Sequence, residues 1–254
     1  MAKLTLLTRI YNSHQLRQID KILGELLDEL NVDATITDNL AGRWVELDLS
    51  GEDESVATNL LAREIGFCPT NIENVKKFSS LKGYTVGLGK NEELIVDIGV
   101  FQPKPIYAAI PLLHLQTHLV SGKKFSLKKI CELLSIGENV PLEIKVLNVD
   151  EKENHIEAEL HSNQIKQFSS WRDSLLDRLL IIGASLYEIN TALNQEHLNR
   201  DIIDTEQLGM FEYALVCKLG TDGTGLISRI GRKLRKAKFF VFEPKKVLAL
   251  NHTS

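Results

Sequence analysis

The sequence predicts an α+β protein in which a five-stranded β-barrel lies between two small α+β domains. The first observation is the alternation of Leu142, Ile144 and Val146 with polar residues, which is typical of a strand with one buried face. The same alternation returns at 156–160, after the polar turn 150–154. The second observation is a set of three more strand patterns upstream, at 84–88, 93–100 and 107–115.

A helical pattern between the third and fourth of these strands is the third observation. Leu127, Ile130 and Leu133 form one apolar stripe within 126–134. Three strands, a helix and two more strands in about eighty residues are the layout of an OB barrel. We therefore expect this barrel to occupy residues 82–162.

Three motifs in the barrel make its identity more specific. They are the run Val-Asp-Ile-Gly at 96–99, the run Ala-Ile-Pro-Leu-Leu-His at 109–114, and Gly137 followed by Leu-Glu-Ile-Lys-Val-Leu-Asn-Val-Asp at 142–150. In this order they resemble an S1 domain, the RNA-binding variant of the OB fold. The chain departs from that pattern in the loop 102–106, which holds two prolines, and in a longer helix before Gly137.

The N-terminal domain, residues 1–78, is expected to be a small α+β sandwich of ferredoxin-like type. Ser13 is placed to cap its first helix, and Gly66 to end its second. A closing strand is predicted near 69–75 and a linker at 76–82. The expected strands are 3–10, 33–38 and 44–49, and the second helix is 55–65.

The C-terminal domain, residues 169–254, has a similar predicted order and is expected to be ferredoxin-like or KH-like. A second linker is predicted at 164–170. The expected helices are 171–180, 188–198 and the segment with Leu226, Ile227, Ile230 and Leu234 inward. The expected strands are 181–185, 201–208, 212–219 and 238–242.

Composition places the chain among ordinary globular proteins. Of its 254 residues, 43% are hydrophobic and 25% charged, and no apolar run is long enough to span a membrane. Because the first residues also lack the apolar run of a signal peptide, we expect a cytoplasmic protein without membrane contact. Cys68, Cys131 and Cys217 are far apart, so they predict buried thiols rather than disulfides or a zinc site.

Charge is distributed unevenly along the chain. Residues 218–246 contain nine basic and two acidic residues, a net charge of +7. Residues 20–64 contain twelve acidic and three basic residues, a net charge of −9. Two surfaces for different partners are one interpretation, and two solvated faces are the other.

The glycine-rich loop 220–225 and the basic segment after it are the best local candidate for a nucleic-acid site. Backbone amides at such a loop and at a helix N-terminus favour an anion, and basic side chains neutralise phosphates. The loop lacks the ending of a P-loop, and Gly220-Thr-Asp-Gly223 resembles the GxxG loop of a KH domain. A purely structural turn is the alternative. The candidate residues are Lys218, Gly220, Gly223, Arg229, Arg232, Lys233, Arg235 and Lys236.

On the barrel, aromatic and basic side chains are the candidates for binding RNA, because OB domains stack bases on aromatic rings. A core role for the phenylalanines is the alternative. Tyr84 and His118 are further candidate stacking groups, and Lys128 and Lys129 are further basic residues around Phe125. The predicted binding residues are Phe101, Tyr107, His114, Lys123 and Lys124.

No motif predicts an active site. His114 and His118 are four residues apart, but the Glu of a HExxH motif is absent, and we expect the pair to run off the end of a strand. We therefore expect no metal, no cofactor and no catalytic residue, and no GxSxG motif is present.

A longer run also carries a resemblance. Val-Cys-Lys-Leu-Gly-Thr-Asp at 216–222, within 213–232, is similar to an archaeal protein family designated domain of unknown function 2110. The resemblance implies an archaeal cytosolic source and carries no functional residues with it.

Three functions follow as hypotheses. The first is a non-enzymatic RNA-binding factor of translation or transcription, which binds single-stranded or ribosomal RNA and docks on a ribosome or RNA polymerase through its acidic domain. The second is a protein-interaction adaptor that does not contact RNA. The third is an enzyme that binds a phosphorylated or nucleotide substrate at the glycine-rich loop.

Overall fold

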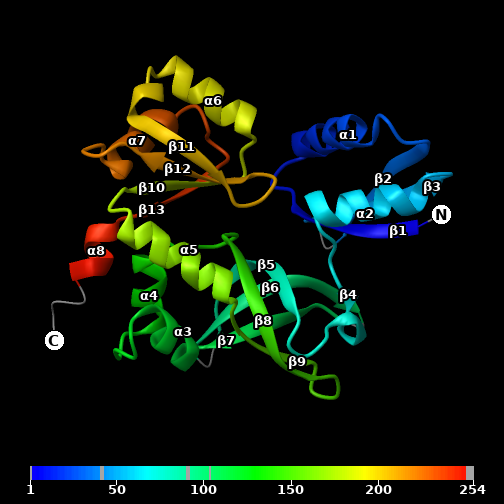
Figure 1. Cartoon of the computed structure of the whole chain (residues 1–254), viewed down its shortest axis with the longest axis horizontal. Helices are drawn as coiled ribbons and strands as arrows, with labels where there is room; N and C mark the ends of the chain where they lie inside the picture. The colour runs from blue at the N-terminus through cyan, green and yellow to red at the C-terminus, as the bar shows by residue number, and fades with distance from the viewer. Residues whose placement is uncertain (1, 41–42, 90–91, 103, 250–254) are drawn as a thin grey trace. The chain divides into compact units, whose positions relative to one another are not determined.

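The structure is a computed structural model that describes residues 2–40, 43–89, 92–102 and 104–249 (Figure 1). The chain forms two compact units. The first contains Met1–Asn74 together with Gly99–Pro105, and the second contains Val75–Ile98 and Ile106–Ser254. The predicted α+β class with a central five-stranded barrel is confirmed.

In the first unit, three antiparallel strands in the order β1-β3-β2 form a sheet with two helices. The helix α1 places Ile19, Leu23 and Leu27 on its buried side, as its apolar spacing predicts. Gly66, at φ +86°, follows the last turn of α2 as expected. The elements are β1 (Ala2–Arg9), α1 (His14–Leu27), β2 (Val32–Leu40), β3 (Trp44–Gly51) and α2 (Glu54–Glu64).

The closing strand predicted near 69–75 is wrong. Only β4 (Thr70–Asn71) is extended there, and it pairs in parallel with the end of β6 rather than with the β1-β3-β2 sheet. A 3₁₀ turn, Ile72–Asn74, follows at once. The backbone at Gly99 lies close to Cys68, because a Cβ atom on Gly99 would be 2.4 Å from Cys68 Sγ. Gly99 therefore ends the Val-Asp-Ile-Gly run for a packing reason.

The barrel is closed by five strands in the order β6-β5-β8-β9-β7, with a further pairing between β6 and β7. The pairs β5–β6, β5–β8 and β8–β9 are antiparallel, and β7–β9 is parallel. Side chains alternate as predicted, with Leu142, Ile144 and Val146 fully buried. The strands are β5 (Ser80–Leu88), β6 (Glu93–Gln102), β7 (Ile106–Pro111), β8 (Pro141–Asp150) and β9 (His155–Leu160).

Two helices join β7 to β8. The predicted helix is α4 (Leu127–Leu133), and the Ser126 side chain accepts a hydrogen bond from the Lys129 amide at its start. The predicted strand 107–115 is too long, because it ends at Pro111 and α3 (Leu112–Leu119) follows. Both His114 and His118 therefore lie on the helix α3.

The predicted linker 164–170 is also wrong, as is the predicted helix 171–180. The segment is the middle of α5 (Ser162–Asp173), which begins directly after the barrel. Trp171 of α5 packs edge to face against Phe242 of the C-terminal sheet, with ring centroids 5.4 Å apart, and Phe168 packs against Trp171. The exposed polar residues of this segment lie on the other face of α5.

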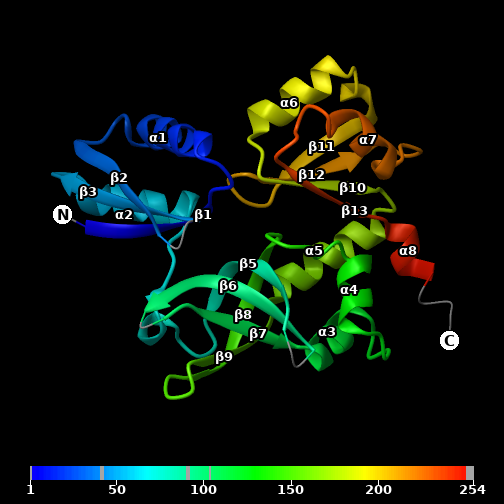
Figure 2. The ribbon, with the colours of Figure 1, turned by 180° about the vertical axis from the view of Figure 1, so that it is seen from behind.

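The C-terminal sheet is antiparallel, in the order β11-β12-β10-β13. With its βαββαβ sequence, this arrangement matches the ferredoxin-like alternative. Figures 1 and 2 show α6 and α7 on one face of the sheet, where Leu179, Ile189 and Leu226 share a buried cluster. The elements are β10 (Arg178–Ile182), α6 (Leu186–Gln195), η2 (Asn199–Asp201), β11 (Ile202–Gln207), β12 (Glu212–Cys217), α7 (Gly223–Ile230), β13 (Lys238–Phe242) and α8 (Pro244–Ala249).

All three cysteines are free and buried, as predicted. None of the helices in the described ranges has the length and apolarity needed to cross a membrane.

Candidate nucleic-acid interface

The predicted aromatic face of the barrel is only partly available. Phe101 belongs to the first unit, where its ring packs edge to face on Trp44 with centroids 6.2 Å apart. Tyr84 is 1% exposed, so it cannot stack a base. Tyr107 is 42% exposed on β7 and remains accessible. Of these three rings, only that of Tyr107 is exposed enough to stack on a base.

Phe78 is an exposed aromatic residue in the segment 76–82, which the sequence predicts to be a linker. Its side chain is 64% exposed, and the ammonium groups of Lys77 and Lys145 lie 5.2 and 5.9 Å from its ring centroid. The backbone of Phe78 has a φ of +67°, an unfavourable value for a bulky residue. Its amide donates to the Val146 carbonyl at 2.8 Å, which fixes this conformation against β8. We call Lys77, Phe78 and Lys145 the Phe78 patch.

The lysines predicted near Phe125 lie in the α3–α4 loop and on the first turn of α4. Lys124, Lys128 and Lys129 are exposed, and Lys123 is half-buried. Gln116 Nε2 donates to the Phe125 carbonyl at 2.8 Å and holds the loop against α3. Phe125 itself is half-buried, in keeping with a packing role.

His114 is not a stacking group on an open strand. It lies on α3, and His118 follows one helical turn later, with the two rings almost parallel at 12° and their centroids 6.3 Å apart. Both imidazoles face the carboxylate of Glu159 on β9. The sequence does not predict Glu159 as their neighbour, because a strand is expected at 107–115 and Glu159 lies far from both histidines along the chain.

The glycine-rich loop is an unfavourable place for a phosphate. The first amides of α7 already donate to carboxylates: Thr224 and Gly225 to Asp222, each at 3.0 Å, and Gly223 to Asp177. An incoming anion would have to displace these carboxylates and would be repelled by their charge. The predicted phosphate contacts of Gly220 and Gly223 are therefore not supported.

Both glycines have conformational roles instead. Gly220 has a φ of +90°, which favours glycine. A Cβ atom on Gly223 would lie 2.8 Å from the Val241 side chain, so the residue allows α7 to approach β13.

The basic candidate residues around this loop divide into two groups. Arg229 and Lys233 each lie 3.9 Å from the Glu196 carboxylate at the end of α6, so they hold α7 to its neighbour. The other group is exposed and makes no ion pair with any residue that the structure describes. It consists of Arg232, Arg235 and Lys236, which we call the basic segment, and of Lys218 farther upstream.

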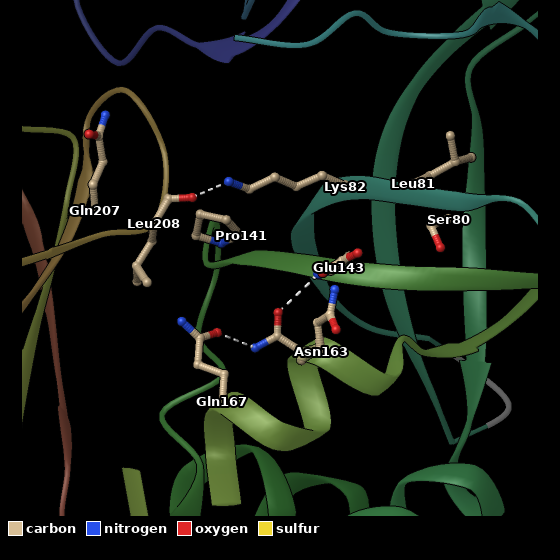
Figure 3. Close-up of a pocket in the computed structure, with 10 residues that line it drawn as sticks. Ser80, Leu81, Lys82, Pro141, Glu143, Asn163, Gln167, Gln207 and Leu208 are labelled. Carbon is tan, nitrogen blue, oxygen red and sulfur yellow. Dashed lines mark hydrogen bonds between the residues drawn. The ribbon is translucent and has the colours of Figure 1, made fainter. Parts of the chain in front are cut away.

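A pocket of about 470 Å³ lies between the barrel, α5 and the turn after β11 (Figure 3). Lys82 of β5 reaches the Leu208 carbonyl there, and Gln164 accepts a hydrogen bond from the Glu143 amide at 3.0 Å. Burial lowers the pKa of Lys82, although Glu212 and Glu143 oppose this effect. Lys82 thus joins the barrel to the turn after β11, and Gln164 joins α5 to β8.

Two family models match the chain. The DUF2110 N-terminal domain matches residues 3–70, and the DUF2110 C-terminal domain matches residues 176–242. Together they cover more than half of the sequence. No curated protein matches.

Several solved structures are similar in part. The uncharacterized protein MJ1198 from Methanocaldococcus jannaschii is 8% identical with a TM-score of 0.24, over 35% of this chain and 95% of that chain. The K3L protein of vaccinia virus is 16% identical with a TM-score of 0.23, over 34% of this chain and 89% of that chain. A chain of the a/eIF2alpha-aDim2p-rRNA complex from Pyrococcus horikoshii is 13% identical with a TM-score of 0.26, over 49% of this chain and 60% of that chain.

Proposed function

We propose that this chain, which belongs to the DUF2110 family, is a non-enzymatic RNA-binding protein that takes single-stranded RNA at the Phe78 patch and the basic segment. The observation that carries the proposal is the largely exposed Phe78 ring with two ammonium groups beside it. An aromatic face next to lysines suits a stacked base whose phosphates are neutralised close by.

The backbone at Phe78 supports the same role. A non-glycine residue at positive φ is unfavourable, and such strain persists where the surrounding structure enforces it. Here the hydrogen bond from the Phe78 amide to Val146 enforces it, and the ring stays in solvent. Burial of the ring would be the expected outcome if its role were only to fill the core.

The basic segment would add affinity without reading sequence. Arg232, Arg235 and Lys236 are exposed and belong to the same compact unit as the Phe78 patch. Each phosphate neutralised by such a side chain releases counterions, so binding weakens as salt rises. Tyr107, Lys124 and Lys129 are further exposed groups on the barrel and its helices that could extend the track.

The first unit would supply a second partner surface. Its segment 20–64 has a net charge of −9, which favours a basic protein surface. In this proposal the partner is a component of the ribosome or of RNA polymerase, and the factor acts in translation or transcription. A pull-down of this chain with that isolated protein component, at low and high salt and without RNA, measures the protein contact by itself.

The test is fluorescence anisotropy with a labelled single-stranded RNA across a salt series. The wild type should bind, with log K falling steeply as log salt rises. Phe78→Ala should weaken binding by about 1–3 kcal/mol, the range for loss of one stacked base. Reversal of Arg232, Arg235 and Lys236 to Glu should flatten the salt slope.

Two matched controls separate the site from general effects. Tyr187→Ala removes an aromatic side chain that is 79% exposed on α6, and it should leave the affinity unchanged. Reversal of Arg17, Lys21 and Arg63 to Glu, on helices of the first unit, changes the net charge by as much as reversal of the basic segment does. Absence of RNA binding by the wild type at low salt would refute the proposal and favour the adaptor hypothesis. An equal loss in Phe78→Ala and Tyr187→Ala would refute the assigned site.

A further inference from the structure

We propose that His114, His118 and Glu159 form a binding site for a divalent zinc-class metal ion. The three residues offer two imidazole nitrogens and one carboxylate oxygen, and these atoms all lie within 4.8 Å of one another. Two histidines and one carboxylate are a donor set that zinc sites use. None of these three donor residues belongs to the proposed RNA-binding site, although Lys145 of the Phe78 patch lies beside Glu159.

Helix geometry aligns the two histidines. They are four residues apart on α3, so their side chains project from one face of the helix about one turn apart. The rings lie almost parallel, at 12°. A strand, as predicted for 107–115, could not place residues four apart in this way over a common point.

The third donor comes from the strand that α3 packs against. The Oε2 atom of Glu159 lies 3.7 Å from His114 Nδ1 and 3.5 Å from His118 Nε2. In a tetrahedral zinc site, ligands about 2.1 Å from the metal are separated from one another by about 3.4 Å. The two separations from Glu159 need to contract by only a few tenths of an ångström, and the two histidine nitrogens lie within 4.8 Å of each other.

The surroundings orient the carboxylate and leave the site accessible. Lys145 Nζ lies 3.2 Å from Oε1 of Glu159, so it holds one oxygen and leaves Oε2 for the histidines. An outer partner of this kind fixes the direction of a ligating carboxylate. The side chains of His114 and His118 are 30% and 33% exposed, which gives an ion a path from solvent. Three protein ligands leave a fourth position for water.

Donor chemistry selects the class of metal. Imidazole suits zinc, cobalt and nickel, whereas magnesium and calcium prefer sets made only of oxygen. The thiols of Cys131 and Cys217 are poor competitors, because burial raises the pKa of each to about 11. A bound ion would join α3 to β9 across the surface of the barrel.

The test is titration of the full chain, after chelator treatment, with Zn²⁺ by calorimetry and with Co²⁺ by visible absorption. We expect one ion per chain and a higher melting temperature with zinc, because an ion that binds the folded state stabilises it. His118→Ala and Glu159→Gln should each weaken binding at least tenfold. His155→Ala, at an exposed histidine on β9, should bind as the wild type does.

Folding is checked separately, by comparing the melting temperatures of all variants in chelator. Glu159→Gln retains the shape of the side chain and keeps the test valid if His118→Ala fails to fold. Wild-type protein that takes up no zinc would overturn the proposal. Stoichiometric binding that persists in a His114→Ala/His118→Ala double variant would overturn it as well, since the ion would then lie elsewhere.

Discussion

The hydroxyl group of Tyr84 lies 3.5 Å from Oε2 of Glu212, although 128 residues separate the two positions. Tyr84 is on β5 of the barrel, and Glu212 begins β12 of the C-terminal sheet. Both side chains are buried, with exposures of 1% and 0%. The Glu212 carboxylate also accepts a hydrogen bond from the Phe211 amide at 3.3 Å. The barrel and the C-terminal sheet are therefore joined through a buried polar contact.

Tyr84→Phe should destabilise the protein by about 1 kcal/mol, because it removes a buried donor from a carboxylate and leaves the ring in place. The free energy of unfolding in urea measures the loss. Tyr187→Phe removes a hydroxyl group from a side chain that is 79% exposed, and it should be neutral. Equal stability of Tyr84→Phe and wild type would show that the contact contributes nothing.

Gly137→Ala should destabilise the protein by about 1–3 kcal/mol, the range for overpacking. The added Cβ atom would lie 2.0 Å from the Phe240 ring, so β13 or the ring has to move. Gly24→Ala is the matched control, since its Cβ meets nothing within 4 Å on α1. That change should raise stability by up to about 1 kcal/mol. Thermal unfolding that ranks the two variants in the opposite order would contradict the packing argument.

Asp222→Ala should destabilise α7 by about 1 kcal/mol, because the side chain caps the helix through the amides of Thr224 and Gly225. Asp222→Asn retains an acceptor oxygen and should lose much less. Chemical denaturation of the two variants gives the comparison. An Ala variant as stable as the Asn variant would remove the case for a structural cap in the glycine-rich loop.

Asp177→Asn should raise stability at neutral pH. Burial raises the pKa of Asp177, and Glu243 and Asp222 add to this effect, while the hydrogen bond from Gly223 opposes it. A carboxyl group with a raised folded-state pKa lowers stability as the pH rises from about 3.9, the value for an unfolded Asp, through its folded pKa. The variant should therefore gain over wild type above this range and match it at lower pH.

Urea unfolding of both proteins from pH 3 to pH 7 measures that difference. Asp204→Asn, at an exposed position on β11, serves as the control and should show no comparable change. A gain for Asp177→Asn that is the same at every pH would refute ionisation of this carboxyl group as the cause.

Much of the fold follows from local patterns in the sequence. Alternation at Leu142, Ile144 and Val146 identifies β8, because every second side chain enters the barrel core. The helix α4 begins where Ser126 predicts it, and β13 has its predicted bounds of 238–242. For α4, the apolar stripe and the capping residue Ser126 lead to the same assignment.

The wrong predictions have a common physical cause. The polar composition of 164–170 predicts a linker, but Trp171 of α5 packs against Phe242 of the C-terminal sheet, and Phe168 packs against Trp171. Phe78 likewise lies in a predicted linker, although the hydrogen bond from its amide to the distant Val146 carbonyl sets its backbone conformation. Such partners lie far along the chain, so no local window contains the information that determines the conformation.

The sequence by itself determined the class of each element with a strong period, the barrel and its S1-like motifs, and the opposite charges of 20–64 and 218–246. Only the tertiary structure decided which side chains meet. It buried Tyr84 against Glu212, left Phe78 in solvent between two lysines, and brought Glu159 to the histidines of α3. Periodicity fixes which face of an element is buried, but contacts between elements depend on strand order and register, which are set when the whole core packs.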